Sequence, residues 1–352
     1  MPDWTKSMQQ YFEYYVVDPN TWMDERRLDN IISSTVVKDN ESDTLESATF
    51  DINDSIDECY IRTYLVTIQN GVRERFPLGT HLVQTPTSSF NGMVTKRSVD
   101  AYSPLIELKE KKPPIGYYIE KNTKIIPTSY LLLRDTMRAP IVKTTDDQTV
   151  YFDFVADTND TYFSFISDLI SNAKFDFGLD ELGRVLFLPR QDTASLRPIW
   201  TFDDGNSSIL CQDVTIEHDL YGVPNVVEVI YSTDSYQYYA KVENNDENSP
   251  VSIQNRGRTI LHRIVNPEFT GEPTQDMIND YAVDALKSLS TLEYSVTYSH
   301  GYCPVRPGDC VLLNYKKAGL DNIKAKIVRQ SINCSAGCTV SEKAVFTAKL
   351  WG

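Results

Sequence analysis

Residues 225–232 read NVVEVIYS, and this stretch gives the clearest indication of the fold. In an extended chain alternate side chains point to opposite faces of a sheet. The side chains on one face are Val227, Val229 and Tyr231, and those on the other are Val226, Glu228 and Ile230. Apolar residues on both faces are typical of a strand that lies between two layers or two subunits. The alternative is a strand of one isolated barrel with an apolar rim.

Similar runs of β-branched and aromatic residues recur on both sides of this stretch, between turn signals. They lie at 59–68, 72–76, 80–85, 92–99, 183–189, 236–242, 293–299, 310–316, 325–332 and 344–352. Asn70-Gly71 separates the first two runs, and an Asn-Gly pair in this position predicts a β-hairpin. Many runs alternate apolar and polar residues, as half-buried antiparallel strands do. The pattern predicts a mainly β protein with minor α.

Three stretches have helical periodicity. Asp160 is the expected N-cap of the first helix, which continues to residue 173, and the second begins at Ser129 or Tyr130 and ends before Pro140. The third spans 274–291, with Thr274 as its expected N-cap. From this layout we expect three parts: a strand-rich block at 1–145, an α+β piece at 146–220, and a second strand-rich block at 221–352 that contains the third helix.

Composition and charge exclude several classes of protein. The 352 residues are 41% hydrophobic, enough for a substantial core, and no apolar run approaches the ~18 residues that span a bilayer. The net charge of −15 argues against a non-specific nucleic-acid binder, which needs a basic footprint. Residues 1–60 hold 14 acidic and 4 basic side chains. This acidic segment either keeps the surface soluble or repels a polyanion. The N-terminus does not resemble a signal peptide, so we expect synthesis in a cytoplasm.

The search for catalytic or metal-binding motifs finds little. The common nucleophile-elbow, zinc-protease, P-loop and dinucleotide motifs do not occur. His300 precedes Cys303 by three residues, but this spacing matches no thiol-protease pattern. The six cysteines are expected to be thiols, and their spacing is a poor match to zinc knuckles. The acidic stretch from Asp157 lacks the glycine and glutamate of a calcium loop, and 203–206 is expected to be a turn. We therefore expect no enzyme activity, no cofactor and no metal.

The Pro307-Gly308-Asp309 sequence predicts a sharp turn into the strand that begins at Cys310. Proline fixes φ, glycine allows positive φ, and the Asp309 carboxylate can accept bonds from nearby backbone N–H groups. The expected role of this turn is structural.

Several segments, taken in order, resemble those of phage tail and baseplate hub proteins, both siphophage and myophage. They include 201–232 with its central Gly222-Val223-Pro224-Asn225-Val226-Val227, and 293–315 with Pro307-Gly308-Asp309-Cys310-Val311. Segments 46–58, 73–86 and 91–113 are similar to the hub's N-terminal barrel. The resemblance implies two antiparallel β-barrel (tail-tube-like) domains, at 1–145 and 221–352, with an α+β insertion at 146–220 between them.

The resemblance also implies a function and partners. Hubs of this kind form a homotrimeric ring that joins the tail tube, or a distal tail protein ring, to the spike or tip protein. The channel holds the C-terminus of the tape measure protein and passes DNA without specific binding. The expected location is the virion, after assembly in the host cytoplasm, with no membrane insertion of its own. The expected subunit-interface residues are Asn225, Val226, Val227, Val229, Pro307, Gly308, Asp309 and Val311.

Two alternatives stay open. One is a tail-associated cell-wall hydrolase with a carboxylate pair, although nothing in the sequence selects a pair and no lysozyme or peptidase domain follows before Gly352. The other is a receptor-binding or carbohydrate-binding module, which requires exposed aromatic platforms. Trp4, Trp22, Trp200 and the tyrosines could supply them.

Overall fold

A long hairpin around Asn70-Gly71 organises the first part of the chain. In the computed structural model, β5 (Tyr60–Gln69) pairs antiparallel with β6 (Val72–Phe90) directly across this turn. Asn70 and Gly71 have φ of +52° and +77°. Positive φ at both central residues is the geometry of a type I′ turn, which matches the twist of the flanking strands. The predicted hairpin is confirmed.

The structure describes residues 1–90, 92, 95–191, 193, 195–233, 236–269 and 272–351. The start of the expected strand at 92–99 therefore lies partly outside the described residues, and the observed strand β7 begins at Thr95. The chain forms two compact units. Unit 1 comprises 1–214 and 298–344, and unit 2 comprises 215–297 and 345–352. These limits do not coincide with the expected boundaries after residues 145 and 220.

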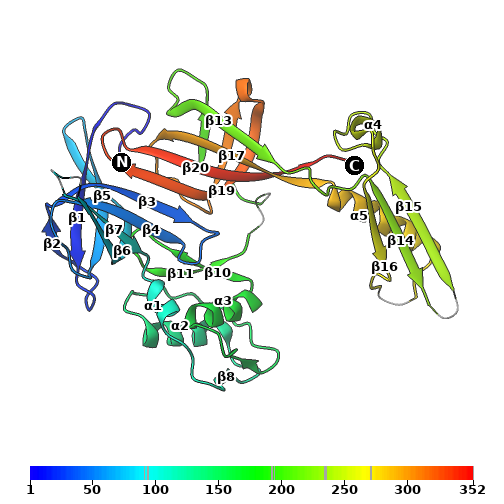
Figure 1. Cartoon of the computed structure of the whole chain (residues 1–352), viewed down its shortest axis with the longest axis horizontal. Coiled ribbons are helices and arrows are strands. Elements are labelled where there is room, and N and C mark those ends of the chain that lie inside the picture. Colours follow the sequence, from blue (N-terminus) through cyan, green and yellow to red (C-terminus); the bar gives the residue numbers. More distant parts are fainter. Residues whose placement is uncertain are drawn as a thin grey trace. The chain divides into compact units, whose positions relative to one another are not determined.

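One sheet of 13 strands contains most of the β-structure (Figure 1). Its main path runs β13-β17-β20-β19-β3-β4-β7-β6-β5-β1-β2, while β18 pairs with β19 and with β12. Besides β5 and β6, its strands are β1 (Gln9–Val17), β2 (Asp24–Leu28), β3 (Ile31–Asp39), β4 (Glu46–Ile52), β7 (Thr95–Tyr102), β12 (Trp200–Asp203), β13 (Leu210–His218), β17 (Thr291–Gly301), β18 (Cys310–Tyr315), β19 (Leu320–Cys334) and β20 (Thr339–Lys349). A 3₁₀ turn, η1 (Lys316–Ala318), follows β18.

The prediction of a mainly β fold with minor α is confirmed, but the described strands do not separate into two closed barrels. The reason is the length of β19. Its first half pairs with β18, and its second half pairs with β3, from Arg329↔Asp39 to Cys334↔Ser34. One 15-residue strand therefore joins the N-terminal strands to the C-terminal strands. Two pairings, β12 with β18 and β14 with β16, are parallel, whereas antiparallel pairing was expected.

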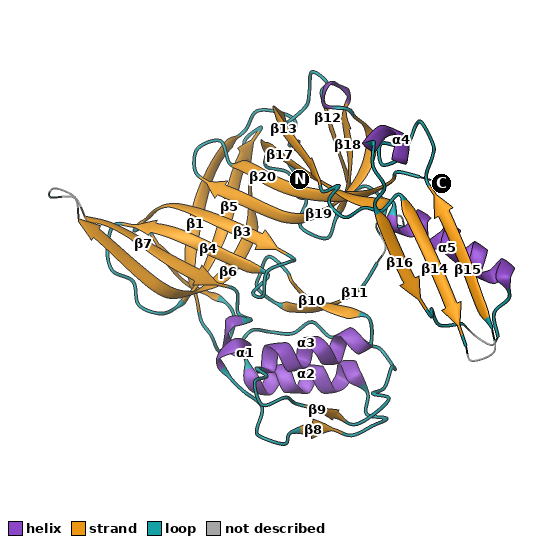
Figure 2. Ribbon diagram, turned by 45° about the vertical axis from the view of Figure 1, so that its right-hand side comes forward, coloured by secondary structure: helices purple, strands orange, loops and turns teal. Residues whose placement is uncertain are grey.

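An α+β subdomain belongs to unit 1 and begins near residue 105, earlier than the expected start at 146. Its elements are α1 (Ile106–Glu110), β8 (Tyr118–Ile119), α2 (Ile125–Thr136), β9 (Phe154–Val155), α3 (Tyr162–Asn172), β10 (Phe175–Leu179) and β11 (Val185–Pro189). Figure 2 shows α2 and α3 between the β10–β11 hairpin and the small β8–β9 sheet. Apolar residues from all these layers form one core, and this core also includes Val17, Tyr60 and Leu82 of the large sheet.

Two helix limits in this subdomain correct the sequence analysis. Helix α2 begins at Ile125 rather than at Ser129 or Tyr130, because Pro127 lies in its first turn, where a backbone N–H has no intrahelical partner. Helix α3 is capped by Thr161 rather than Asp160: Thr161 accepts a bond from the Ser164 N–H, and the Ser164 hydroxyl bonds back to the Thr161 N–H. This reciprocal pair is a capping box.

Unit 2 is built around residues 225–232, whose apolar alternation predicts a buried strand. Its elements are β14 (Val226–Ser232), β15 (Gln237–Glu243), α4 (Ile253–Arg256), β16 (Leu261–Val265) and α5 (Gln275–Leu289). Strand β14 is central in a sheet of order β15-β14-β16. The predicted third helix is confirmed as α5, with Thr274 as its N-cap. Its buried face, Ile278, Ala282 and Leu286, packs on Val227, Val229 and Ala240.

Candidate functional site

The expected interface residues of β14 are buried inside unit 2. Asn225 accepts a bond from the Ile260 N–H (2.7 Å) and donates to the Arg258 carbonyl (2.9 Å), which fixes the entry into the strand. Val227 and Val229 contact α5. In the chain itself these side chains therefore hold the unit-2 core together. Their role at a subunit interface remains a prediction.

The expected turn at Pro307–Asp309 forms as predicted, in unit 1. Gly308 has φ of +98°, and the Asp309 carboxylate accepts a bond from the Arg306 N–H at 3.0 Å. Val311 follows in β18, fully buried and paired with Trp200 of β12. The expected interface residues thus belong to two different units, 225–229 to unit 2 and 307–311 to unit 1.

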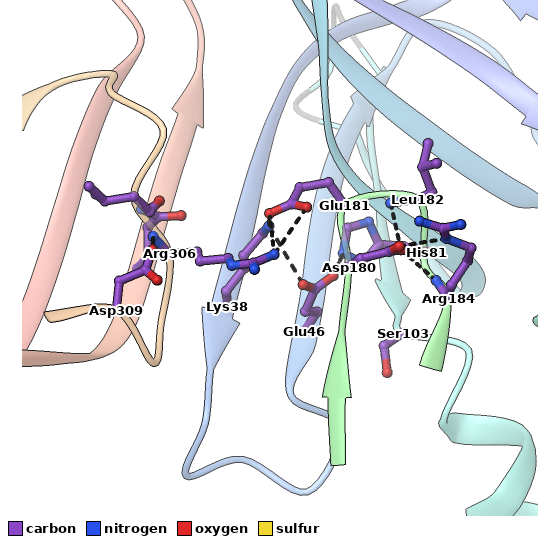
Figure 3. Close-up of polar contacts among 12 residues, drawn as sticks. Lys38, Glu46, His81, Ser103, Asp180, Glu181, Leu182, Arg184, Arg306 and Asp309 are labelled. Carbon is purple, nitrogen blue, oxygen red and sulfur yellow. Dashed lines mark hydrogen bonds and ion pairs between the residues drawn. The ribbon is translucent and has the colours of Figure 1, made fainter. Parts of the chain in front are cut away.

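Beside this turn lies a buried polar group that the sequence analysis did not identify, here called the Lys38 cluster (Figure 3). It comprises Lys38 of β3, Glu46 of β4, His81 of β6 and Glu181 of the β10–β11 turn. The Lys38 ammonium lies 3.7 Å from Glu46 and 3.6 Å from Glu181, and His81 Nε2 lies 3.7 Å from Glu46 Oε2. Arg306 approaches Glu181 at 3.5 Å. Side chains of the consecutive strands β3 and β4 therefore meet β6 and the β10–β11 turn, which are distant from them in sequence, next to the Pro307 turn.

Burial controls the electrostatics of the Lys38 cluster. It raises the pKa of Glu46 to about 7, although the Lys38 ammonium favours the ionised carboxylate. Burial, together with the Lys38 charge, lowers the pKa of His81 to about 3, so His81 is neutral at pH 7. Burial would raise the pKa of Glu181, but the Lys38 and Arg306 charges outweigh it and lower that pKa. At neutral pH one cation thus faces one fully ionised and one half-titrated carboxyl.

A second set of contacts holds the β10–β11 turn to the large sheet. Arg62 of β5 is buried and donates to Thr80 Oγ1 (2.9 Å), to Asp24 (2.8 Å) and to the Leu182 carbonyl (3.2 Å). The Trp22 indole also donates to the Leu182 carbonyl, at 2.7 Å. With the Lys38–Glu181 ion pair, these bonds anchor the α+β subdomain on strands β2, β3, β5 and β6.

The sequence does contain a signal for the Lys38 cluster. Lys38 follows Ser34 and Val36 at alternate positions of β3, and all three are buried. Glu46 likewise precedes Ala48 and Phe50 on the inward face of β4. A charged residue in phase with buried positions indicates a paired charge, because an unpaired buried charge is costly. The identity of the partners, however, depends on which strands are neighbours.

The His300 and Cys303 side chains belong to a second buried polar group, not to a nucleophilic site. His300 Nδ1 lies 2.6 Å from the Gly301 carbonyl, which occupies that nitrogen, and 3.9 Å from the Cys303 sulfur. Burial raises the pKa of the Cys303 thiol well above its ordinary value, so the thiolate is disfavoured. Glu342 accepts bonds from Tyr298 (2.7 Å) and Gln330 (2.8 Å), and it lies 3.3 Å from His300 Nε2.

The described residues contain no group of three or more His, Cys, Asp or Glu side chains placed to hold a metal ion. All six cysteines are free thiols. The expected turn at 203–206 is present, with the Gly205 N–H donating to Asp203 (2.9 Å). It borders a surface hollow of about 180 Å³ that Tyr315 and Lys317 also line. Within the described part of the chain, no helix is both long and apolar enough to cross a bilayer.

Comparison with solved structures finds the same fold in phage tail proteins. The tail protein from Neisseria meningitidis MC58 is similar over 96% of both chains, with a TM-score of 0.61 and 10% sequence identity. The 43 kDa tail protein of prophage MuSo2 from Shewanella oneidensis is similar over 96% of this chain and 98% of that chain, with a TM-score of 0.59 and 11% identity. No family model and no curated protein matches the sequence.

These likenesses extend over nearly the whole chain, including both units and the α+β subdomain. The chain therefore has the fold of a phage tail protein, as the resemblance implied. At 10–11% identity, the agreement lies in the arrangement of the elements rather than in individual side chains.

Proposed function

We propose that the protein is a structural component of a phage tail, and specifically the hub of the tail tip or baseplate. In this role it forms a homotrimeric ring that joins the tail tube, or a distal tail protein ring, to the spike or tip protein. The single observation that carries the proposal is the fold: two tail proteins match this chain along 96% of its length. The virion is then its location.

The form of the large sheet supports a role in assembly. Strands β2 and β13 are at the ends of its hydrogen-bonded path, so each has one edge without a described partner strand in the chain. Exposed strand edges are positions where another chain can add its own strand. Closed rotational symmetry is the usual way in which such self-association ends in a ring.

The charge distribution supports a channel that passes DNA without binding it. Acidic side chains at the end of β4 and in the segment after it are exposed, namely Asp51, Asp54, Asp57 and Glu58. If these carboxylates line the channel of the ring, they repel phosphate and reduce binding during ejection. The same channel would hold the C-terminus of a tape measure protein before ejection. Their location on the outer rim of the ring would contradict this part of the proposal.

The cell-wall hydrolase is the weaker alternative. Burial raises the pKa of Glu46 to about 7, as a general acid needs, but its side chain is only 5% exposed. The cavity beside it is about 30 Å³, enough for two or three water molecules at about 10–15 Å³ each. A sugar ring does not fit there. A receptor-binding module has more support, because the chain carries exposed aromatic side chains, among them Tyr151 and Phe152.

Negative-stain electron microscopy with symmetry classification tests the proposal. We expect three-fold rings with a central hole and a mass of about 120 kDa, three times the 40.1 kDa chain. Monomers at all concentrations, and in the presence of a purified tail-tube protein, would contradict the trimeric hub. A peptidoglycan-release assay separates the hub from the hydrolase: the hub releases nothing.

A further inference from the structure

Five large apolar side chains are exposed together at the end of the α+β subdomain, here called the aromatic tip. The exposed fractions are 96% for Ile115, 86% for Tyr151, 75% for Phe152, 60% for Val155 and 51% for Tyr118. They come from two segments, around β8 and β9, which the small sheet brings together. Figure 2 shows this sheet on the side of α2 and α3 away from β10.

Strand pairing and core packing fix the outward direction of side chains in the aromatic tip. Strands β8 and β9 pair through Tyr118↔Val155 and Ile119↔Phe154. Because side chains alternate across a strand, the second pair turns inward: Ile119 is 5% exposed, and the Phe154 ring lies 5.0 Å from the Phe165 ring of α3. The first pair therefore turns outward. The core that anchors the inner pair thus fixes the direction of the outer pair.

The neighbouring segment holds Tyr151 and Phe152 in place. The Lys121 N–H donates to the Asp153 carboxylate at 2.9 Å, and the Asn122 N–H donates to the Val150 carbonyl at 2.8 Å. These bonds bracket the two aromatic residues, whose rings lie edge to face with centroids 5.4 Å apart. Since neither ring fills the core, the packing of this chain does not explain why two aromatic residues stand at these exposed positions.

Clustered exposed apolar side chains mark a binding site, and aromatic residues are enriched at the centres of protein–protein interfaces. The charges around the tip indicate the partner. Segments 112–122 and 149–160 contain Glu120, Asp153, Asp157 and Asp160 against Lys112 and Lys121, a local net charge of −2. This negative charge disfavours an anionic bilayer as the partner. It also disfavours a second copy of the chain, whose net charge is −15.

We propose that the aromatic tip docks into an apolar pocket with a basic rim on a different protein of the same particle. Tyr151, Phe152 and Ile115 fill the pocket, and Glu120 and Asp153 face its basic groups. This inference rests on the proposed function, because it requires the chain to be part of a tail.

Site-specific photo-crosslinking in assembled particles tests the inference. Tyr151 is replaced by p-benzoylphenylalanine, and the matched control carries the same replacement at Tyr221, which is 92% exposed in unit 2. On illumination, position 151 is expected to crosslink to another polypeptide, at a peptide with apolar residues flanked by Lys or Arg. Position 221 is not expected to give this product. Glu120→Lys should lower the crosslink yield by about tenfold, because it opposes the basic rim.

The outcomes separate the two proposals. If the chain is present in particles but position 151 crosslinks to a second copy, to lipid, to a glycan or to nothing, the docking inference is wrong and the tail function stands. An unchanged yield with Glu120→Lys refutes the basic rim. If mass spectrometry finds the chain in no particle, the proposed function itself fails, and the docking inference fails with it.

Discussion

Replacing Glu46 by glutamine should change how the stability of the protein depends on pH. The folded-state pKa of Glu46 is raised from 4.5 to about 7, chiefly by burial. Between these two values the folded state binds more protons than the unfolded state. The contribution of Glu46 to the free energy of unfolding is therefore present at low pH and is lost as the pH rises from 4.5 to 7.

The size of the effect follows from the same interval. At about 1.4 kcal/mol per pH unit, the stability lost through Glu46 between pH 4.5 and 7 is about 3 kcal/mol. His81 acts in the opposite direction, because its pKa is lowered from 6.5 to about 3, so its contribution grows as the pH rises through this range. Between pH 4.5 and 6.5 the contributions of Glu46 and His81 to the slope of the unfolding free energy against pH nearly cancel in the natural protein. Glu46→Gln removes the contribution of Glu46 and leaves that of His81.

Urea unfolding followed by tryptophan fluorescence, at intervals from pH 4.5 to 8, measures the difference in free energy of unfolding between variant and natural protein. This difference should shift by about 3 kcal/mol in favour of the variant as the pH rises, and then level off above pH 7. Glu41→Gln, an exposed change in the adjacent β3–β4 turn, serves as the control and should not reproduce the shift. A difference that stays constant with pH would refute the reasoning about Glu46.

Three further predictions concern single contacts. Arg62→Met should cost about 3–5 kcal/mol, because Asp24 loses its buried partner, and faster hydrogen exchange in the β10–β11 turn would report it. Slow exchange there would argue against an anchoring role. Leu286→Ala should destabilise unit 2 by about 2–5 kcal/mol, measured by exchange in β14, since it opens a cavity under that sheet. Thr161→Ala should cost about 1 kcal/mol in thermal unfolding, and Thr161→Ser should restore it.

Local features of the fold could be predicted because they depend on neighbouring residues. The type I′ turn needs positive φ at two adjacent residues, and Asn70-Gly71 supplies it. The buried face of α5 follows from residues spaced by 3.6, and the Pro307–Asp309 turn follows from the chemistry of three consecutive side chains. The limits of α2 were less predictable. Pro127 reads as a helix breaker in sequence, but a first turn accepts it.

The candidate site was harder to predict from the sequence. Val227 and Val229 were identified from alternation and Asn225 from the resemblance to hub proteins. Alternation indicates burial but not whether the covering layer is another subunit or the same chain. Helix α5 of the same chain is that layer. The aromatic tip was equally hidden, because Tyr151 and Phe152 are unremarkable in sequence, and their exposure depends on the pairing of β8 with β9.

The sequence by itself determined the class of the fold, its turns, the faces of α3 and α5, and the acidic surface. Each of these depends on composition or on residues that are close together in the sequence. Tertiary structure decided the rest. The pairing of Ser34 with Cys334 joins the two ends of the chain in one sheet, and the Lys38 cluster brings together titratable side chains from β3, β4, β6 and the β10–β11 turn. Such contacts depend on which strand edges meet after collapse. Alternation indicates only that a residue is buried, and it does not identify the residue against which it is buried.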